Sequence, residues 1–205
     1  YGYAEYLQRA PATEKERFEC TRFILSECER LQNLAYQLLD LAALREIETK
    51  DCAVEELFQR VCGIMQVKAE KKEIILDSAC GPEYISGNME LLITLLSNLI
   101  DNALKASPAG SVIRLDAAEE EDTLILEVTD QGIGMTKEQI AHIKEAFYRV
   151  DKSRSRAAGG AGLGLSICER IVQLHQGKLE FISLPGEGTT ARVFLPCGME
   201  NRESL

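Results

Sequence analysis

The first part of the chain carries apolar residues at helical spacing. Residues 1–10 have the pattern of the last turns of a helix, which Pro11 ends because proline lacks a backbone N–H. Thr13 and Glu16 form the capping-box pattern of a second helix, which we place at about 14–48. Its apolar positions step alternately by four and three residues, at Ile24, Cys28, Leu31, Ala35, Leu38 and Ala42. This broad stripe predicts a homodimeric four-helix bundle, and packing on the chain's own globular part is the alternative.

The rest of the chain mixes helical spacing with strand-like alternation. After a linker at 49–51, the pattern predicts helices over 53–69, 89–104, 136–146 and 162–176, the last ending at Gly177, and strands over 73–77, 83–86, 111–117, 123–129, 178–184 and 189–195. Residues 148–160 are polar, basic and glycine-rich, which is typical of a mobile loop. No βαβ repeat is evident. The pattern therefore predicts an α+β fold, a two-layer sandwich of a mixed, mostly antiparallel sheet with helices on one face.

Composition narrows the function classes. A net charge of −10 argues against non-specific binding of nucleic acid, and the chain has no run of about 18 apolar residues that could cross a membrane. The seven cysteines, at positions 20, 28, 52, 62, 80, 168 and 197, form no CxxC pair. We interpret them as reduced core residues of a cytosolic protein rather than as metal ligands or disulfides. With two histidines, a histidine-rich metal site is not expected.

The apolar helix at 89–104 carries polar side chains on one face. Asn98 and Asn102 lie one turn apart, and Lys105 follows three residues later. Amide oxygens suit Mg²⁺, and a lysine ammonium can neutralise a phosphate. Helix capping or a polar core network is the alternative for a single asparagine. Two asparagines and a lysine in so apolar a helix favour a phosphate and metal site.

A carboxylate and two glycines follow the strand at 123–129. Asp130 ends this strand and precedes Gly132 and Gly134 in the sequence DQGIGM. A carboxylate there can accept a hydrogen bond from an exocyclic amine, and glycines let the backbone approach a flat ring. Alone, this pattern is better explained by an ordinary turn. Beside the asparagine helix it indicates a ligand site.

A glycine-rich turn, GGAGLGL at 159–165, opens the helix over 162–176. Helix amino termini attract phosphate, and glycines allow close approach. The turn is preceded by a basic loop and not by a strand, so a dinucleotide-binding fingerprint is rejected. Residues 144–156 carry five basic side chains against two acidic ones, a local reversal of charge that suits a polyphosphate. A solvated basic loop is the alternative for any one of these residues.

These segments, with GEGTT at 186–190, occur in the order and spacing of a known family. They resemble the catalytic ATP-binding domain of sensor histidine kinases, within the superfamily of gyrase, the ninety-kilodalton heat-shock chaperone and MutL. NLIDNALKAS is similar to its asparagine box, DQGIGM, GGAGLGLSI and GEGTT to its glycine boxes, and EAFYRVDKSRSR to its phenylalanine box and lid. Residues 1–48 resemble part of the family's antiparallel dimerisation and phosphotransfer hairpin, and 49–205 the catalytic domain.

The resemblance implies a set of residue roles and partners. It implies ATP and Mg²⁺ as ligands, with Asn98 and Lys105 acting on phosphate, Asn102 on the metal and Asp130 on the adenine amine. The other implied nucleotide-binding residues are Gly132, Gly134, Phe147, Arg149, Lys152, Gly160, Gly162, Leu163, Gly164 and Thr189. The γ-phosphoryl would pass to a hairpin histidine and then to an aspartate of a response regulator. The chain would be the cytoplasmic part of a homodimeric protein anchored at the cell membrane through segments outside this sequence.

Three features depart from the family pattern. The acceptor histidine would lie upstream of Tyr1, so this chain is not expected to phosphorylate itself, and His142 and His175 are interpreted as structural. Thr94 stands where hydrolytic relatives have a glutamate base, which favours a kinase. Ala106 stands where an aromatic residue is frequent. Two alternatives remain: a serine kinase of the anti-sigma type, and a degenerate module that binds nucleotide without transfer.

Overall fold

The computed structural model describes residues 2–9, 13–25, 28, 47–81, 84–145, 148 and 163–197. Helix α1 covers Gly2–Arg9, and residues 14–25 form the start of a second helix. The capping box is confirmed, because Thr13 N–H donates to Glu16 Oε2 at 2.8 Å and Glu16 N–H donates to Thr13 Oγ1 at 3.3 Å. Most of the predicted bundle stripe lies outside the described residues.

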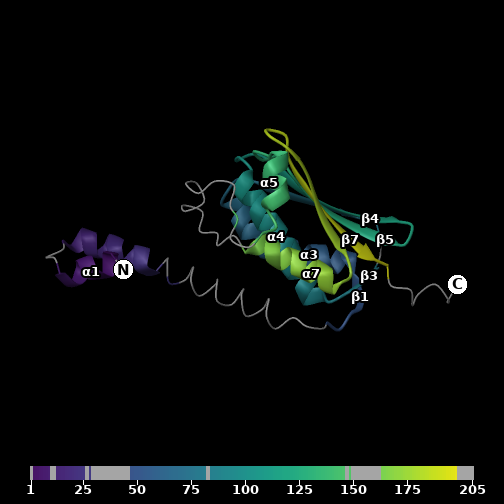
Figure 1. Ribbon diagram of the computed structural model, residues 1–205, viewed down its shortest axis with the longest axis horizontal. Helices are drawn as coiled ribbons and strands as arrows, with labels where there is room; N and C mark the ends of the chain where they lie inside the picture. Colours follow the sequence, from purple (N-terminus) through teal and green to yellow (C-terminus); the bar gives the residue numbers. More distant parts are fainter. Residues whose placement is uncertain are drawn as a thin grey trace.

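The described residues from 47 onwards form an α+β fold of two layers. Its elements are β1 (Lys50–Ala53), α3 (Val54–Glu70), β2 (Ile75–Cys80), β3 (Tyr84–Gly87), α4 (Met89–Ala106), β4 (Val112–Glu120), β5 (Thr123–Asp130), α5 (Lys137–His142), α7 (Gly164–Leu174), β6 (Lys178–Leu184) and β7 (Gly188–Pro196). Five strands form one open sheet in the order β2-β4-β5-β7-β6, parallel at β2–β4 and antiparallel elsewhere. Helices α3, α4 and α7 cover one face of it, with α4 between the other two (Figure 1). The predicted fold class is confirmed.

Three local predictions were wrong. The linker at 49–51 contains the start of β1, which pairs antiparallel with β3 in a separate two-stranded ribbon. A four-residue strand with only Cys52 buried gives too little alternation to be recognised. β2 and β4 form a parallel pair joined through β3 and α4, so one crossover connection is present after all. The helix predicted over 136–146 ends at His142.

The core explains why the sequence of α4 is so apolar. Because α4 lies between two helices and also packs on the sheet, most of its circumference is covered, and Leu92, Leu95 and Ile100 have no exposed surface. Each such side chain contributes about 1.5–3 kcal/mol of transfer free energy. The prediction that the cysteines lie in the core is confirmed for Cys20, Cys52 and Cys168, which are buried, but not for Cys28 and Cys80, which are exposed.

The C-terminal end of α7 differs from its prediction. Gln176, and not Gly177, takes the left-handed backbone conformation there, with φ of 56°. Gly177 has a different constraint, since a Cβ on it would lie 2.3 Å from the Phe194 carbonyl oxygen. The glycine is therefore required by the close approach of the chain to β7 and not by the cap of the helix.

His175 follows α7 and is 5% exposed, which fits its interpretation as a structural residue. Its Nδ1 lies 2.8 Å from the Ile171 carbonyl oxygen, and its Nε2 accepts a hydrogen bond from Asn88 N–H at 3.0 Å. An acceptor at Nε2 requires the neutral ring. Burial lowers the pKa of His175, although the Ile171 carbonyl opposes this shift.

We expect this histidine to make folding pH-dependent. A pKa lowered in the folded state means that the unfolded chain takes up the proton first. The stability contribution of His175 is therefore complete above pH of about 6.5 and is lost as the pH falls from there through the folded pKa, by up to about 1.4 kcal/mol per pH unit. Denaturant titrations of the wild type and His175→Gln between pH 7.5 and 5 measure this slope. His142→Gln, which removes the exposed histidine beside Glu145, is the comparison variant for the loss of an imidazole elsewhere. If the free energy of unfolding of His175→Gln changes with pH as steeply as that of the wild type, His175 is not the source of this pH dependence.

Candidate functional site

Asp130 ends β5 on the face of the sheet that the helices cover. Its side chain is 7% exposed, and its Oδ1 accepts a hydrogen bond from Gly132 N–H at 2.7 Å. Burial raises the pKa of Asp130, while the backbone amides of Gly132 and Thr189 act in the opposite direction. A buried carboxyl with one oxygen satisfied by its own loop is suited to accept a hydrogen bond from a ligand at the other.

The loop after Asp130 packs directly on the end of α4. A Cβ on Gly132 would lie 2.8 Å from Ala106 Cβ, and Ile133 N–H donates to the Ala106 carbonyl oxygen at 3.3 Å. Gly132 is thus required by the contact with α4. Ala106, which departs from the family pattern, therefore lies at the contact between α4 and this loop.

The same loop is fixed to the turn between β6 and β7. Gly134 has φ of 63°, and a Cβ on it would lie 1.9 Å from the Leu184 carbonyl oxygen. Gly188 has φ of 87°, and a Cβ there would lie 2.0 Å from the Asp130 carbonyl oxygen. Gly186 N–H donates to the Ile133 carbonyl oxygen at 2.7 Å. The first and last glycine-marked segments, more than fifty positions apart in the printed sequence, therefore form one wall of the site.

The asparagines of α4 adjoin the start of α7. A Cβ on Gly164 would lie 3.4 Å from Asn98 Oδ1, so the first turn of α7 passes beside this amide. Asn102 is one turn closer to Asp130 along α4, and its Nδ2 is buried with no hydrogen-bond partner among the residues that the structure describes. A buried amide nitrogen without a partner costs about 1–3 kcal/mol, a cost that a ligand can relieve.

Lys105 forms an ion pair with a carboxylate of its own helix. Its Nζ lies 2.5 Å from Asp101 Oδ2, and Lys68 of α3 lies 3.0 Å from the other oxygen of the same carboxylate. Burial raises the pKa of Asp101, but the hydrogen bonds and charges of Lys105 and Lys68 outweigh it and hold the pKa below its usual value. Lys105 is thus paired within the protein here, and contact with a phosphate remains a prediction.

The lid side of the site is described only in part. Leu163 is buried and caps α7, and Gly164 begins it. Phe147, Arg149, Lys152, Gly160 and Gly162 lie outside the described residues. Lys144, which counted among the predicted basic groups, instead contacts Glu169 of α7 at 3.0 Å and donates to the Leu179 carbonyl oxygen.

Sequence reasoning missed Ser183. This residue of β6 is paired in register with Thr189 of β7, which is paired with Asp130 of β5. The three residues form one row across three strands, and their alternation places them on the helix-covered face. Only knowledge of the strand register could have found Ser183, since its local sequence carries no motif.

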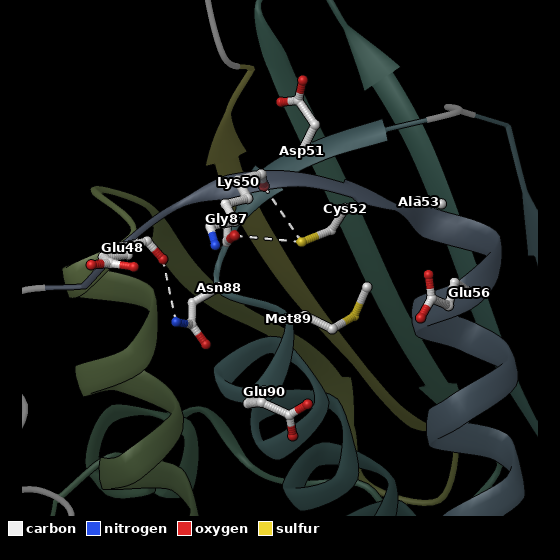
Figure 2. Close-up of a pocket in the computed structure, with 10 residues that line it drawn as sticks. All are labelled: Glu48, Lys50, Asp51, Cys52, Ala53, Glu56, Gly87, Asn88, Met89 and Glu90. Atoms are coloured by element: carbon white, nitrogen blue, oxygen red, sulfur yellow. Dashed lines mark hydrogen bonds between the residues drawn. The ribbon is translucent and has the colours of Figure 1, made fainter.

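A cavity of about 390 Å³ lies elsewhere, beside the β1–β3 ribbon and the N-terminal ends of α3 and α4 (Figure 2). Its lining includes Asn88, whose Nδ2 donates to the Glu48 carbonyl oxygen at 3.3 Å, and Cys52, whose thiol contacts the Lys50 and Gly87 carbonyl oxygens. Four acidic residues line it, Glu48, Asp51, Glu56 and Glu90, against one basic residue, Lys50. This acidic lining is unsuited to a polyphosphate, and the cavity is at the opposite end of α4 from Asn102.

Comparisons with known proteins identify the family of the chain. The family model of histidine kinase-, DNA gyrase B- and HSP90-like ATPases matches residues 87–199, which include the asparagine helix, Asp130 and the glycine turns. The chain belongs to this family. It is 33% identical over 182 residues to the sensor-like histidine kinase SenX3 of Mycobacterium tuberculosis, covering 86% of this chain and 44% of that protein. It is also 33% identical over 195 residues to the sensor histidine kinase WalK of Bacillus subtilis, covering 89% and 31%.

Solved structures place the same fold among histidine kinases. The Acinetobacter baumannii histidine kinase AdeS matches with a TM-score of 0.76 and 17% identity over 96% of this chain and 92% of that one. Full-length ShkA in complex with AMPPNP matches with a TM-score of 0.75 and 26% identity over 96% and 42%. The chain spans less than half the length of the curated relatives SenX3 and WalK. Among the described helices, none combines the length and apolar character needed to cross a bilayer.

Proposed function

We propose that this chain is the ATP-binding catalytic core of a two-component sensor histidine kinase. The observation that carries the proposal is the buried Asp130 carboxyl, held by Gly132 N–H and adjoining the end of α4 through the loop that follows it. Adenine would meet Asp130 and Thr189, and the phosphates would extend along Asn102 and Asn98 towards the start of α7. The AMPPNP complex of ShkA, 26% identical over 96% of this chain, supports an adenine nucleotide as the ligand.

Asn102 fits a magnesium ligand. Its amide oxygen is a hard donor of the kind that Mg²⁺ prefers, and its buried Nδ2 has no hydrogen-bond partner among the described residues. The described residues contain no group of three or more His, Cys, Asp and Glu side chains that could hold a metal ion, so an all-protein cage is not built here. When bound, Mg²⁺ would neutralise phosphate charge. The ion would then keep several waters besides Asn102.

In the proposed transfer the protein positions groups and stabilises charge. The attacking imidazole of the hairpin is itself the nucleophile, so no base is needed to activate water. The position of Thr94 supports a mechanism without such a base, since this residue is exposed and its hydroxyl donates to the Glu90 carbonyl oxygen. Asn98 would orient phosphate beside α7, and Lys105 would exchange Asp101 for a phosphate oxygen. A histidine of the hairpin would receive the phosphoryl group and pass it to a response regulator.

The bundle also forms part of the proposal. Phe18, Phe23 and Leu25 of the second helix are 70%, 49% and 58% exposed, which is apolar surface that the described residues leave uncovered. We propose that a second copy of the chain covers it in a homodimer. The proposed whole protein is held at the cell membrane by segments outside this sequence, with this part in the cytoplasm.

A phosphotransfer assay tests the proposal. The chain, incubated with γ-labelled ATP and a separately made hairpin that carries a histidine, should label that histidine with acid-labile phosphate. Labelling is expected to be slow, because the two parts are not tethered. Acid-stable label on serine would favour the anti-sigma type of kinase. Tight ATP binding without any label would favour the module that binds without transfer.

Replacement of Asn102 by alanine should remove most of the Mg²⁺ dependence of ATP binding. The reason is that one of few protein oxygens available to the ion is lost. Calorimetric titration of ATP with and without Mg²⁺ measures the effect. Thr94→Ala changes the exposed face of the same helix and is the control, with unchanged behaviour expected. An Asn102→Ala protein whose affinity still responds to Mg²⁺ as in the wild type would rule out the metal role.

A further inference from the structure

Ser183 has more hydrogen-bond partners than a surface strand serine needs. Its Oγ accepts from Met135 N–H at 2.8 Å, donates to the Gly188 carbonyl oxygen at 2.8 Å, and lies 2.9 Å from Thr189 Oγ1. These partners belong to the loop after Asp130 and to the start of β7. One hydroxyl therefore joins the two segments that form the wall of the candidate base site.

The hydrogen positions follow from counting donors. A serine hydroxyl has one hydrogen and two lone pairs. The hydrogen of Ser183 is used on the Gly188 carbonyl oxygen, and one lone pair is used by Met135 N–H. The contact with Thr189 must then have the Thr189 hydroxyl donating to Ser183. Thr189 is left with lone pairs only, so it can accept a hydrogen bond from a ligand but has no hydrogen to donate.

The acceptor groups of Thr189 and Asp130 favour some purine bases over others. Thr189 is paired in register with Asp130, whose carboxylate is also an acceptor. The row therefore presents acceptors from both strands, which suits the exocyclic amine of adenine. A purine with a carbonyl oxygen in that place, as in inosine or guanine, would set acceptor against acceptor.

We propose that Ser183 is a positioning residue for the nucleotide base, which fixes the Thr189 hydroxyl as an acceptor and holds the Met135 end of the loop. This inference rests on the proposed function, because it concerns the base that this same site binds. Ser183 acts through Thr189 and the loop, and it does not itself contact the base. Its contribution is selectivity for an amine over a carbonyl at the purine six position.

The test compares ATP with inosine triphosphate. Wild-type protein should bind ATP more tightly than inosine triphosphate in calorimetric titrations. Ser183→Ala frees the Thr189 hydroxyl to rotate and donate, so the ratio of the two affinities should fall by roughly ten-fold, the loss expected for one buried hydrogen bond. Ser183→Thr keeps a hydroxyl and should hold the ratio within about three-fold of wild type. Binding of inorganic tripolyphosphate, which has no base, should change in neither variant.

A control and a double variant separate a positioning role from general damage. Thr190 is next to Thr189, but its hydroxyl meets Thr129 at 3.1 Å on the outer face of the sheet. Thr190→Val should therefore leave the ratio unchanged. Thr189→Val should lower the ratio as Ser183→Ala does, and the double variant should lose no more than Thr189→Val alone.

The results of these titrations either support or overturn the positioning role of Ser183. An unchanged ratio in folded Ser183→Ala, an equal loss in Thr190→Val, or additive losses in the double variant would overturn the role of Ser183. If Ser183→Ala does not fold, as judged by circular dichroism, Thr189→Val carries the test, and an unchanged ratio in that variant overturns the inference. A wild-type protein that binds neither nucleotide overturns the proposed function itself.

Discussion

Replacement of Asp130 by asparagine is expected to weaken ATP binding by roughly ten- to a hundred-fold, which corresponds to about 1–3 kcal/mol. The amide oxygen of the new side chain would take over the hydrogen bond from Gly132 N–H, now 2.7 Å from Oδ1. The amide nitrogen would then stand in place of the second carboxylate oxygen. Two donors, this nitrogen and the adenine amine, would face each other in a buried site, where an unmatched polar group is costly.

A matched substitution on the same sheet is the control. Asp116 of β4 lies on the outer face and pairs with Arg114 at 2.9 Å. Asp116→Asn removes the same charge without altering the site, so its affinity for ATP should equal that of the wild type. Calorimetric titration of both variants, with circular dichroism to establish folding, measures the difference. Wild-type affinity in a folded Asp130→Asn protein would show that adenine does not meet this carboxyl.

Replacement of Gly188 by alanine is expected to lower the free energy of unfolding by about 2–5 kcal/mol. Two costs combine. A residue with a side chain is strained at a φ of 87°, and its Cβ would lie 2.0 Å from the Asp130 carbonyl oxygen, where one strand or the other must move. Because that carbonyl belongs to the residue proposed to hold adenine, nucleotide affinity should fall together with stability.

Gly186 separates these two costs. It lies in the same turn with a φ of 84°, but a Cβ there would meet no atom within 4 Å. Gly186→Ala should therefore cost only the backbone strain, about 1–2 kcal/mol, and should keep ATP affinity. Thermal and denaturant unfolding of the two variants measure the steric cost as their difference. Equal destabilisation would mean that β5 and β7 yield to the added methyl group without cost.

Much of the fold and part of the site could be predicted from the pattern of residues. Strands β4 to β7 and helices α3, α4 and α7 are present within a few residues of their predicted bounds, because alternation and helical spacing repeat over enough positions to identify them. β1 was missed because it pairs with β3 and not with a sequence neighbour, and four residues carry no period. The left-handed residue after α7 was misplaced because glycine also serves close packing, as at Gly177.

The sequence by itself determined the residue types of the site: asparagines on an apolar helix, a carboxylate at a strand end, and glycines where the chain turns. These are local properties, set by spacing and by the chemistry of each side chain. Only the tertiary structure decided which groups meet. The register of β5, β7 and β6 aligns Asp130, Thr189 and Ser183, and the packing of α3 on α4 joins Lys68, Asp101 and Lys105. Such contacts depend on strand pairing and helix packing between distant segments, which no local pattern encodes.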